Sequence, residues 1–267
     1  MKILSGPNRK VAYYVGLALV TSNALYPTYA AQPTPRSDET SAAQGKILIT
    51  ETRARLPDHV GNGLNCSNCH LDAGTRAYAT PFTNIWHDYP TYDARSGKII
   101  SLADRINECF TRSMNGTALD NNSSQMRSIL AYIALLSPDI ADNKMSVGRG
   151  VGRISAALHA DAVRGKQIFA QSCAACHGAN GFGTRVANGQ PVPPLWGPDS
   201  FNDGAGMART SRAAAFVLHN MPLGKGNTLT EQDALDVAAF FTHQSRPVFA
   251  RKSGDWPNGQ KPADARN

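Results

Sequence analysis

The sequence contains the pattern Cys-x-x-Cys-His twice, as Cys66-Ser-Asn-Cys69-His70 and as Cys173-Ala-Ala-Cys176-His177. In an exported protein this pattern is typical of the covalent attachment site of haem c. Two thiols at this spacing reach the two vinyl groups of one porphyrin, and the histidine that follows places an imidazole nitrogen under the iron. One copy could also be half of a zinc site or a redox dithiol. Two copies with histidine in register predict two covalently bound haem c groups.

The first thirty residues predict an export signal. A basic region ends at Lys10, an apolar run extends from Val11 to Val20, and small residues at Thr28 and Ala30 suit a cleavage site. The apolar run is too short to span a bilayer, and no later run is long enough, so we expect no stable membrane insertion. An uncleaved membrane anchor is the alternative. The expected compartment is the periplasm, which is oxidising.

Composition excludes other classes of protein. Charged residues make up 18% and hydrophobic residues 42% of the 267 residues, which excludes a disordered chain. The net charge of +7 comes without a block of lysines and arginines, so nucleic acid is not an expected partner. Aromatic residues are scarce for two conventional cores, and two porphyrins would fill the remaining space.

The two motifs lie 107 residues apart, and the same offset places Leu130–Ile133 on Val237–Phe240. Both segments predict amphipathic helices. The first lies between the polar residues 121–124 and Pro138, and the second begins at the capping-box pattern of residues 230–233. We therefore expect a mainly α chain with two cytochrome c-like domains.

The expected organisation has four parts and a tail. These are a signal peptide at 1–30, a first domain at 31–145, a linker at 146–155, and a second domain at 156–267. The tail after Arg246 is polar and is expected to wrap the surface.

The second haem needs a distal ligand, and the candidates are Met207, His219, Met221 and His243. Met221 precedes a proline in a loop ahead of the last predicted helix, where cytochromes c place their thioether ligand. Proline stiffens such a loop, and thioether ligation raises the reduction potential. We expect Met221 to bind this iron, with Met207 and His219 as alternatives. The segment Val192–Leu195 is expected to pack along the proximal edge of this haem.

Cys109 is the odd cysteine, and such a residue is a reactive thiol, an intermolecular partner or a metal ligand. On a helix ending near Gly116, Arg105 stands four residues before it, and Arg112 and Ser113 follow at three and four. Neighbouring cations favour the thiolate, and thiolate binds iron. Arg105, Arg112 and Arg95 could also hold an oxyanion.

Two alternatives stay open on the residues alone. Cys109 could be a buried, inert side chain with solvated arginines. The distal ligand of the first haem could instead come from the other residues able to bind iron there, which are His87, Met114, Met126 and Met145.

The segment Tyr89–Gly116, together with both haem motifs and the His219–Pro222 loop, resembles the thiosulfate dehydrogenase family. That family is related to the catalytic cytochrome subunit of the Sox system. The resemblance implies His70 and Cys109 as ligands of the first, catalytic haem, and His177 and Met221 as ligands of the second. It implies Arg95, Arg105 and Ser113 as substrate-site residues. Some members carry Lys beside the methionine ligand, where this chain has Asn220, so a Lys/Met exchange is not expected.

The implied reaction joins two thiosulfate ions into tetrathionate and passes two electrons through the second haem to a small cytochrome c or similar acceptor. We hypothesise that Cys109 leaves the iron and forms a transient adduct with one thiosulfate, which a second thiosulfate attacks. The preferred direction stays open. The alternatives are a dihaem electron carrier and a Sox-type subunit that acts with a partner cytochrome.

Overall fold

The computed structural model describes residues 39–137 and 148–266. The predicted export signal at residues 1–30 lies outside the described residues, and so does the predicted domain boundary after residue 145. Among the described residues, no helix combines the length and the apolar character that a bilayer crossing requires.

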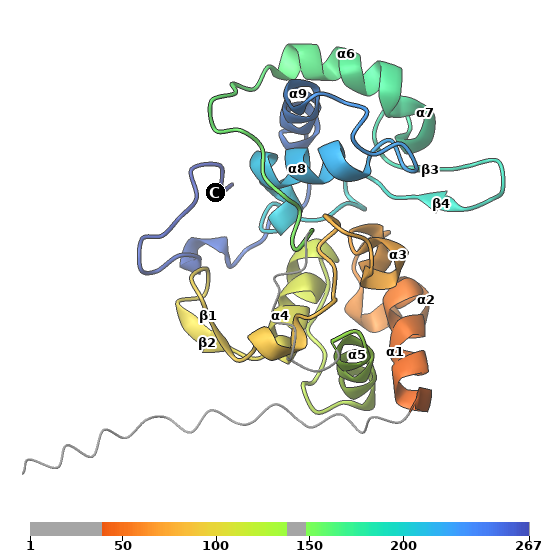
Figure 1. The fold of residues 1–267 in the computed structure, drawn as a ribbon, viewed down its shortest axis with the longest axis vertical. Helices are drawn as coiled ribbons and strands as arrows, with labels where there is room; N and C mark the ends of the chain where they lie inside the picture. The colour runs from red at the N-terminus through yellow and green to blue at the C-terminus, as the bar shows by residue number, and fades with distance from the viewer. Residues whose placement is uncertain (1–38, 138–147, 267) are drawn as a thin grey trace, which may run out of the picture. The chain divides into compact units, whose positions relative to one another are not determined.

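The part of the chain up to residue 137 consists of short helices and one β-hairpin (Figure 1). Its α-helices are α1 (Glu39–Thr50), α2 (Thr52–Arg55), α3 (Leu71–Gly74), α4 (Leu102–Glu108) and α5 (Ser124–Leu135). Short 3-10 helices span Pro57–His59, Cys66–Asn68 and Trp86–Asp88, and a π-helical turn at Cys109–Ser113 continues α4. Strands β1 (Thr91–Asp93) and β2 (Lys98–Ile100) pair antiparallel, with Tyr92 opposite Ile99.

The part from residue 148 onward has a similar plan. Its α-helices are α6 (Ala162–Ser172), α7 (Ala174–His177), α8 (Thr210–Asn220) and α9 (Glu231–Thr242). Two-residue strands β3 (Thr184–Arg185) and β4 (Pro191–Val192) pair antiparallel, and 3-10 helices span Gly206–Ala208 and Lys252–Gly254.

In both parts the first long helix packs against the last one, α1 against α5 and α6 against α9 (Figure 1). Glycine allows each close approach. A Cβ atom at Gly45 would overlap the carbonyl of Ser128, and one at Gly165 would overlap the carbonyl of Asp236. In each helix pair, therefore, a glycine of the first helix packs directly against a backbone carbonyl of the second.

The two predicted late helices are confirmed. The backbone amide of Met126 donates to the Ser123 hydroxyl at the start of α5, and Thr230 and Asp233 form a reciprocal capping box at the start of α9. The helices end before Pro138 and Pro247, as expected.

Apolar side chains form a core in each part. One core gathers around Phe110, Leu130 and Ile133, and the other around Phe169, Val237 and Phe241. The chain is mainly α, as predicted.

Most residues of the tail after Arg246 are exposed, as the expected surface wrapping requires, and a few anchor points are buried. Arg246 and Phe249 are buried, and the Arg246 guanidinium lies 4.3 Å from the centroid of the Phe201 ring. The backbone amide of Trp256 donates to the carbonyl of Arg95 at 2.7 Å. This end of the chain thus contacts both parts of the molecule, Phe201 in the second part and Arg95 in the first.

Candidate haem sites and arginine cluster

The first Cys-x-x-Cys-His motif and Cys109 face one cavity. Cys66, Cys69, His70, Cys109 and Ser113 all line it, together with apolar side chains of α1, α4 and α5. The motif lies on a 3-10 helix, and Cys109 stands where α4 passes into the π-helical turn. The structure therefore brings together the residues that the sequence singled out as haem ligands and as the reactive thiol.

The two motif histidines are oriented for metal binding. His70 Nδ1 lies 2.6 Å from the carbonyl of Thr80, and His177 Nδ1 lies 2.9 Å from the carbonyl of Pro193. A metal-binding histidine commonly donates its second ring N–H to a backbone carbonyl in this way, which leaves Nε2 for the metal. Burial lowers the pKa of His70 to about 4 and also lowers the pKa of His177, so both rings stay neutral.

The second motif lines a larger cavity of about 400 Å³ with mostly apolar walls. Cys173, Cys176, His177, Met207 and Met221 all face it. The segment Val192–Leu195 lines the same cavity, and within it the carbonyl of Pro193 contacts His177. These donors and walls fit a porphyrin whose iron is bound by histidine and by a methionine.

Two of the other candidate ligands of the second haem are engaged elsewhere. The His219 ring stacks on Tyr78 with centroids 4.0 Å apart, and His243 Nδ1 lies 2.7 Å from the carbonyl of Ala239. Neither residue lines the cavity. Asn220 is buried and donates to the carbonyls of Tyr78 and Phe216. Met207 and Met221 are left as candidates.

The other candidates for the first haem differ in position. His87 is exposed and contacts the carbonyl of Ser137, and Met126 is fully buried in the core. Met114 lines the same cavity as Cys109. Met145 lies outside the described residues.

The two haem cavities adjoin. The second cavity is also lined by Leu64, Ser67, Cys69 and Leu71, which belong to the first motif and its surroundings. Cys69 lines both cavities. Electrons can therefore pass between groups bound in the two cavities over a short path.

Arg105 contacts the sulfur of Cys109. Its Nη1 lies 3.5 Å from Sγ and 3.3 Å from a carboxylate oxygen of Glu108. The Cys109 sulfur is the largest cause that raises the pKa of Arg105, and Glu108 adds to it. A permanent cation thus stands beside the sulfur, as the sequence predicted.

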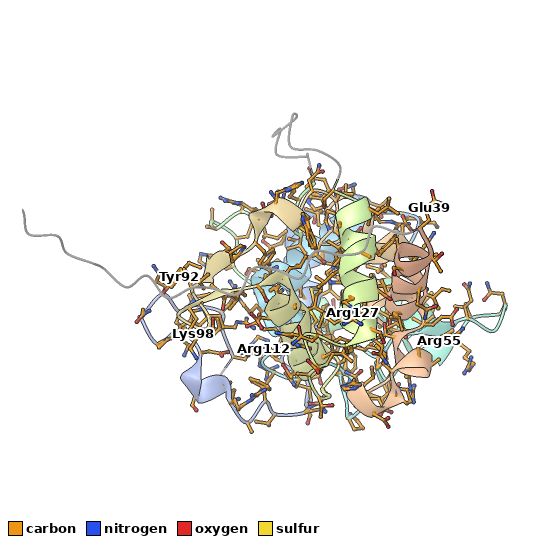
Figure 2. The ribbon with its side chains drawn as sticks, turned by 90° about the horizontal axis from the view of Figure 1, so that it is seen from below. Glu39, Arg55, Tyr92, Lys98, Arg112 and Arg127 are labelled. Carbon is orange, nitrogen blue, oxygen red and sulfur yellow. The ribbon has the colours of Figure 1, made fainter. Side chains whose placement is uncertain are left out.

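The other two predicted arginines have partners from distant parts of the chain. Arg112 donates two hydrogen bonds to the carboxylate of Asp255, and Arg95 donates to the carbonyl of Gly204 at 2.8 Å. Figure 2 shows Arg112 between the β1–β2 hairpin, which carries Tyr92 and Lys98, and α5, which carries Arg127. Arg112 is therefore a structural ion-pair partner, and Arg95 keeps only part of its hydrogen-bonding capacity for a ligand.

Two residues near Arg95, Arg105 and Arg112 were not predicted from the sequence, namely Asp255 and Arg212. Asp255 stands alone in a polar tail, and its local signal is the neighbouring Trp256, an aromatic residue in an otherwise polar segment. Arg212 on α8 comes near Arg105 and Arg95, and its signal is the basic start of that helix. Both belong to the second part of the chain, so spacing along the sequence could not link them to Cys109.

A bare metal site is not supported. Within residues 39–137 and 148–266, no group of three or more His, Cys, Asp and Glu side chains is arranged to hold a metal ion. The zinc alternative for the motifs therefore finds no donor set in the described parts of the chain.

Two family models match the chain. The SoxA/TsdA cytochrome c domain matches residues 58–141, and cytochrome c matches residues 162–245. These matches confirm the predicted fold class of two cytochrome c domains, and the protein carries two covalently bound haem c groups.

Curated relatives share much of the sequence. The chain is 45% identical over 232 residues to a thiosulfate dehydrogenase of Psychrobacter arcticus, covering 86% of this chain and 71% of that protein. It is 42% identical over 220 residues to a thiosulfate dehydrogenase of Allochromatium vinosum, covering 80% and 82%. A solved structure of thiosulfate dehydrogenase (TsdBA) from Marichromatium purpuratum aligns with a TM-score of 0.73 at 38% identity. That alignment covers 83% of this chain and 49% of the solved chain, so this chain spans about half of that protein's length.

Proposed function

Because the chain belongs to the thiosulfate dehydrogenase family, we propose that it is an oxidoreductase that joins two thiosulfate ions into tetrathionate. The observation that supports this most directly is the contact of 3.5 Å between Arg105 Nη1 and the sulfur of Cys109, which faces the cavity of the first motif. A cation beside a reactive sulfur suits chemistry on a sulfur dianion. The preferred direction of the reaction stays open.

The proposal assigns the ligands as follows. Cys66 and Cys69 attach the first haem and Cys173 and Cys176 the second. His70 and Cys109 would bind the first iron, with Cys109 leaving it when the reaction begins, and His177 and Met221 would bind the second. The two haems supply the redox chemistry when bound, each taking up one electron.

Arg95, Arg105 and Ser113 form the substrate site. Two thiosulfate dianions repel each other, and this repulsion is strong in a partly buried site. Guanidinium groups offset it and hold sulfonate oxygens through charge-assisted hydrogen bonds. Ser113 lines the cavity beside Cys109, where its hydroxyl can donate to the same anion.

Cys109 is the residue on which the S–S bond is made. Its sulfur joins the terminal sulfur of the first thiosulfate, and this step releases two electrons. The terminal sulfur of a second thiosulfate then attacks the bound terminal sulfur, and the Cys109 thiolate leaves as tetrathionate forms. No net proton is taken up or released.

Location and electron acceptor belong to the same proposal. The predicted export signal at residues 1–30 supports a periplasmic site of action. The first domain, at residues 31–145, catalyses the reaction. The second domain, at residues 156–267, passes electrons to a small cytochrome c or similar acceptor.

The test is thiosulfate-dependent reduction of an artificial acceptor by the purified dihaem protein, with tetrathionate measured as product. Cys109→Gly should abolish turnover while both haems stay attached. Thr111→Ala is the matched control, since its hydroxyl bonds within the same turn to the carbonyl of Asn107 and it should keep turnover. Normal activity of Cys109→Gly would refute the role of Cys109. No turnover by the unaltered protein in either direction would favour an electron carrier or a subunit that needs a partner cytochrome.

A further inference from the structure

Arg212 is a half-buried arginine near the start of α8. Its neighbours are paired: Arg209 Nε lies 2.8 Å from a carboxylate oxygen of Asp264, and the backbone amide of Ser211 donates to the same carboxylate. Across residues 39–137 and 148–266, the guanidinium of Arg212 forms no hydrogen bond and no ion pair. A cation in this position is costly to bury unless a ligand satisfies it.

Arg212 comes near the arginines of the first domain. Its Nε lies beside Gly206, 3.6 Å from where a Cβ of that residue would stand. Two residues away, the carbonyl of Gly204 accepts a hydrogen bond from Arg95. Burial and the guanidinium groups of Arg105, Arg209 and Arg95 together lower the pKa of Arg212 to about 10, although the carboxylate of Asp264 opposes this shift. Arg95 of the β1–β2 hairpin and Arg212 of α8 thus both lie at this loop, and Arg105 of α4 is near enough to act on the charge of Arg212.

The three arginines Arg95, Arg105 and Arg212 differ in how closely a carboxylate approaches each guanidinium. Arg105 has Glu108 at 3.3 Å, and Arg95 has Asp255 at 4.0 Å. Arg212 has no carboxylate in contact within the described residues. Like charges held together in a partly buried place favour a bound anion, since an anion replaces their repulsion by attraction.

We infer that Arg212 binds a sulfonate group of thiosulfate and completes, from the second domain, the anion site formed by Arg95 and Arg105 in the first. This inference rests on the proposed function, because it takes the substrate class from it. The site is then shared by two domains, and a substrate dianion bridges them. Two thiosulfate ions carry four negative charges, and a third guanidinium brings the site closer to balancing them.

Arg212 also stands on the helix that leads to the second haem cavity. Helix α8 begins at Thr210, and Met221 follows its last residue. At 1.5 Å per residue, Arg212 and Met221 are separated by roughly 14 Å along the axis. Binding of the anion therefore fixes the start of the helix whose other end carries a residue lining the electron-transfer cavity.

The test is calorimetric titration of thiosulfate into the dihaem protein with both haems reduced beforehand, so that thiosulfate binds without being oxidised. Arg212→Gln should weaken binding by about tenfold or more, which is the loss of one charge-assisted hydrogen bond. Arg212→Lys should recover part of the affinity. Arg209→Gln is the matched control, since it removes the same charge from the same helix end but from an ion pair already made. It should bind within about twofold of the unaltered protein.

Three results would overturn the inference: unchanged affinity in Arg212→Gln, an equal loss in Arg209→Gln, or no binding by the unaltered protein. Failure of the proposed function has a different signature. In that case thiosulfate binding would depend on Arg212, yet the oxidised protein would form no tetrathionate.

Discussion

The carboxylate of Asp255 accepts two hydrogen bonds from the guanidinium of Arg112, at 2.7 and 2.8 Å, although 143 residues separate the two in the chain. Both side chains are buried, with 6% and 11% of their surfaces exposed. The Arg112 guanidinium also lies 4.3 Å from the centroid of the Phe249 ring. This pair fastens the tail after Arg246 to the turn that carries Cys109.

We expect Asp255→Asn to lower the free energy of unfolding by about 3 kcal/mol, because removing one partner leaves a buried charge uncompensated. The double variant Arg112→Met, Asp255→Asn should recover much of this loss, since neither charge then remains. Denaturant unfolding of the dihaem protein measures both. If Asp255→Asn were as stable as the unaltered protein, the ion pair between Arg112 and Asp255 would not stabilise the fold.

Arg105→Gln should lower kcat/KM for thiosulfate by about 10² to 10³, the usual effect of removing a charge-stabilising donor. The physical reason is the loss of the cation that contacts the Cys109 sulfur. Glu108→Gln serves as the control, because it removes the carboxylate that competes for Arg105 and should not lower the rate. Steady-state kinetics with haem content as a check tests this prediction, and an equal fall in both variants would count against it.

Met221→Leu should lower the reduction potential of the second haem, since loss of a thioether ligand removes its stabilisation of the reduced iron. Met207→Leu, which alters the other methionine in the same cavity, should leave the potential unchanged. Redox titration followed by absorption spectroscopy separates the two. A shift in Met207→Leu alone would reassign the ligand.

Gly165→Ala should destabilise the second domain by about 2 kcal/mol, because a Cβ there would overlap the carbonyl of Asp236 and force α6 away from α9. Gly254→Ala is the matched control, since a Cβ at that position meets no atom within 4 Å. Thermal unfolding of the dihaem protein gives both values. Equal stability of the two variants would mean that the helices can separate at little cost.

Asp264→Asn should change how stability depends on pH. Burial alone would raise the pKa of Asp264, but hydrogen bonds from Ser211 and Arg209 hold it below its ordinary value of 3.8. A carboxylate with a lowered pKa contributes stability that is complete above the unfolded value and is lost as the pH falls through the folded value. The variant should therefore be less stable by about 1 kcal/mol at neutral pH, and the difference should vanish in strong acid. Melting temperatures across this range test the prediction, and a difference that grows on acidification would contradict it.

Most features that could be predicted from the sequence depend on residues close together in the chain. The Cys-x-x-Cys-His motifs, the capping residues Ser123 and Thr230, and the pairing of Arg105 with Cys109 at four residues all depend on neighbours in the chain. Residues this close in sequence are brought together by local geometry, so their contacts can be predicted without the tertiary fold.

Partners distant in sequence could not be predicted. The helix expected to run to Gly116 ends at Glu108 and continues as a π-helical turn, which moves Arg112 toward Asp255. The tail that holds Asp255 has few apolar residues, so composition predicted exposure. Arg212 approaches Arg105 only because the two domains meet at the loop around Gly206.

Synthesis proceeds from the amino terminus, so Asp255 emerges after both haem motifs and after every other residue of the arginine cluster. A chain stopped at residue 245 would lack Asp255, so the turn carrying Cys109 would lose the ion pair that fastens it to the tail.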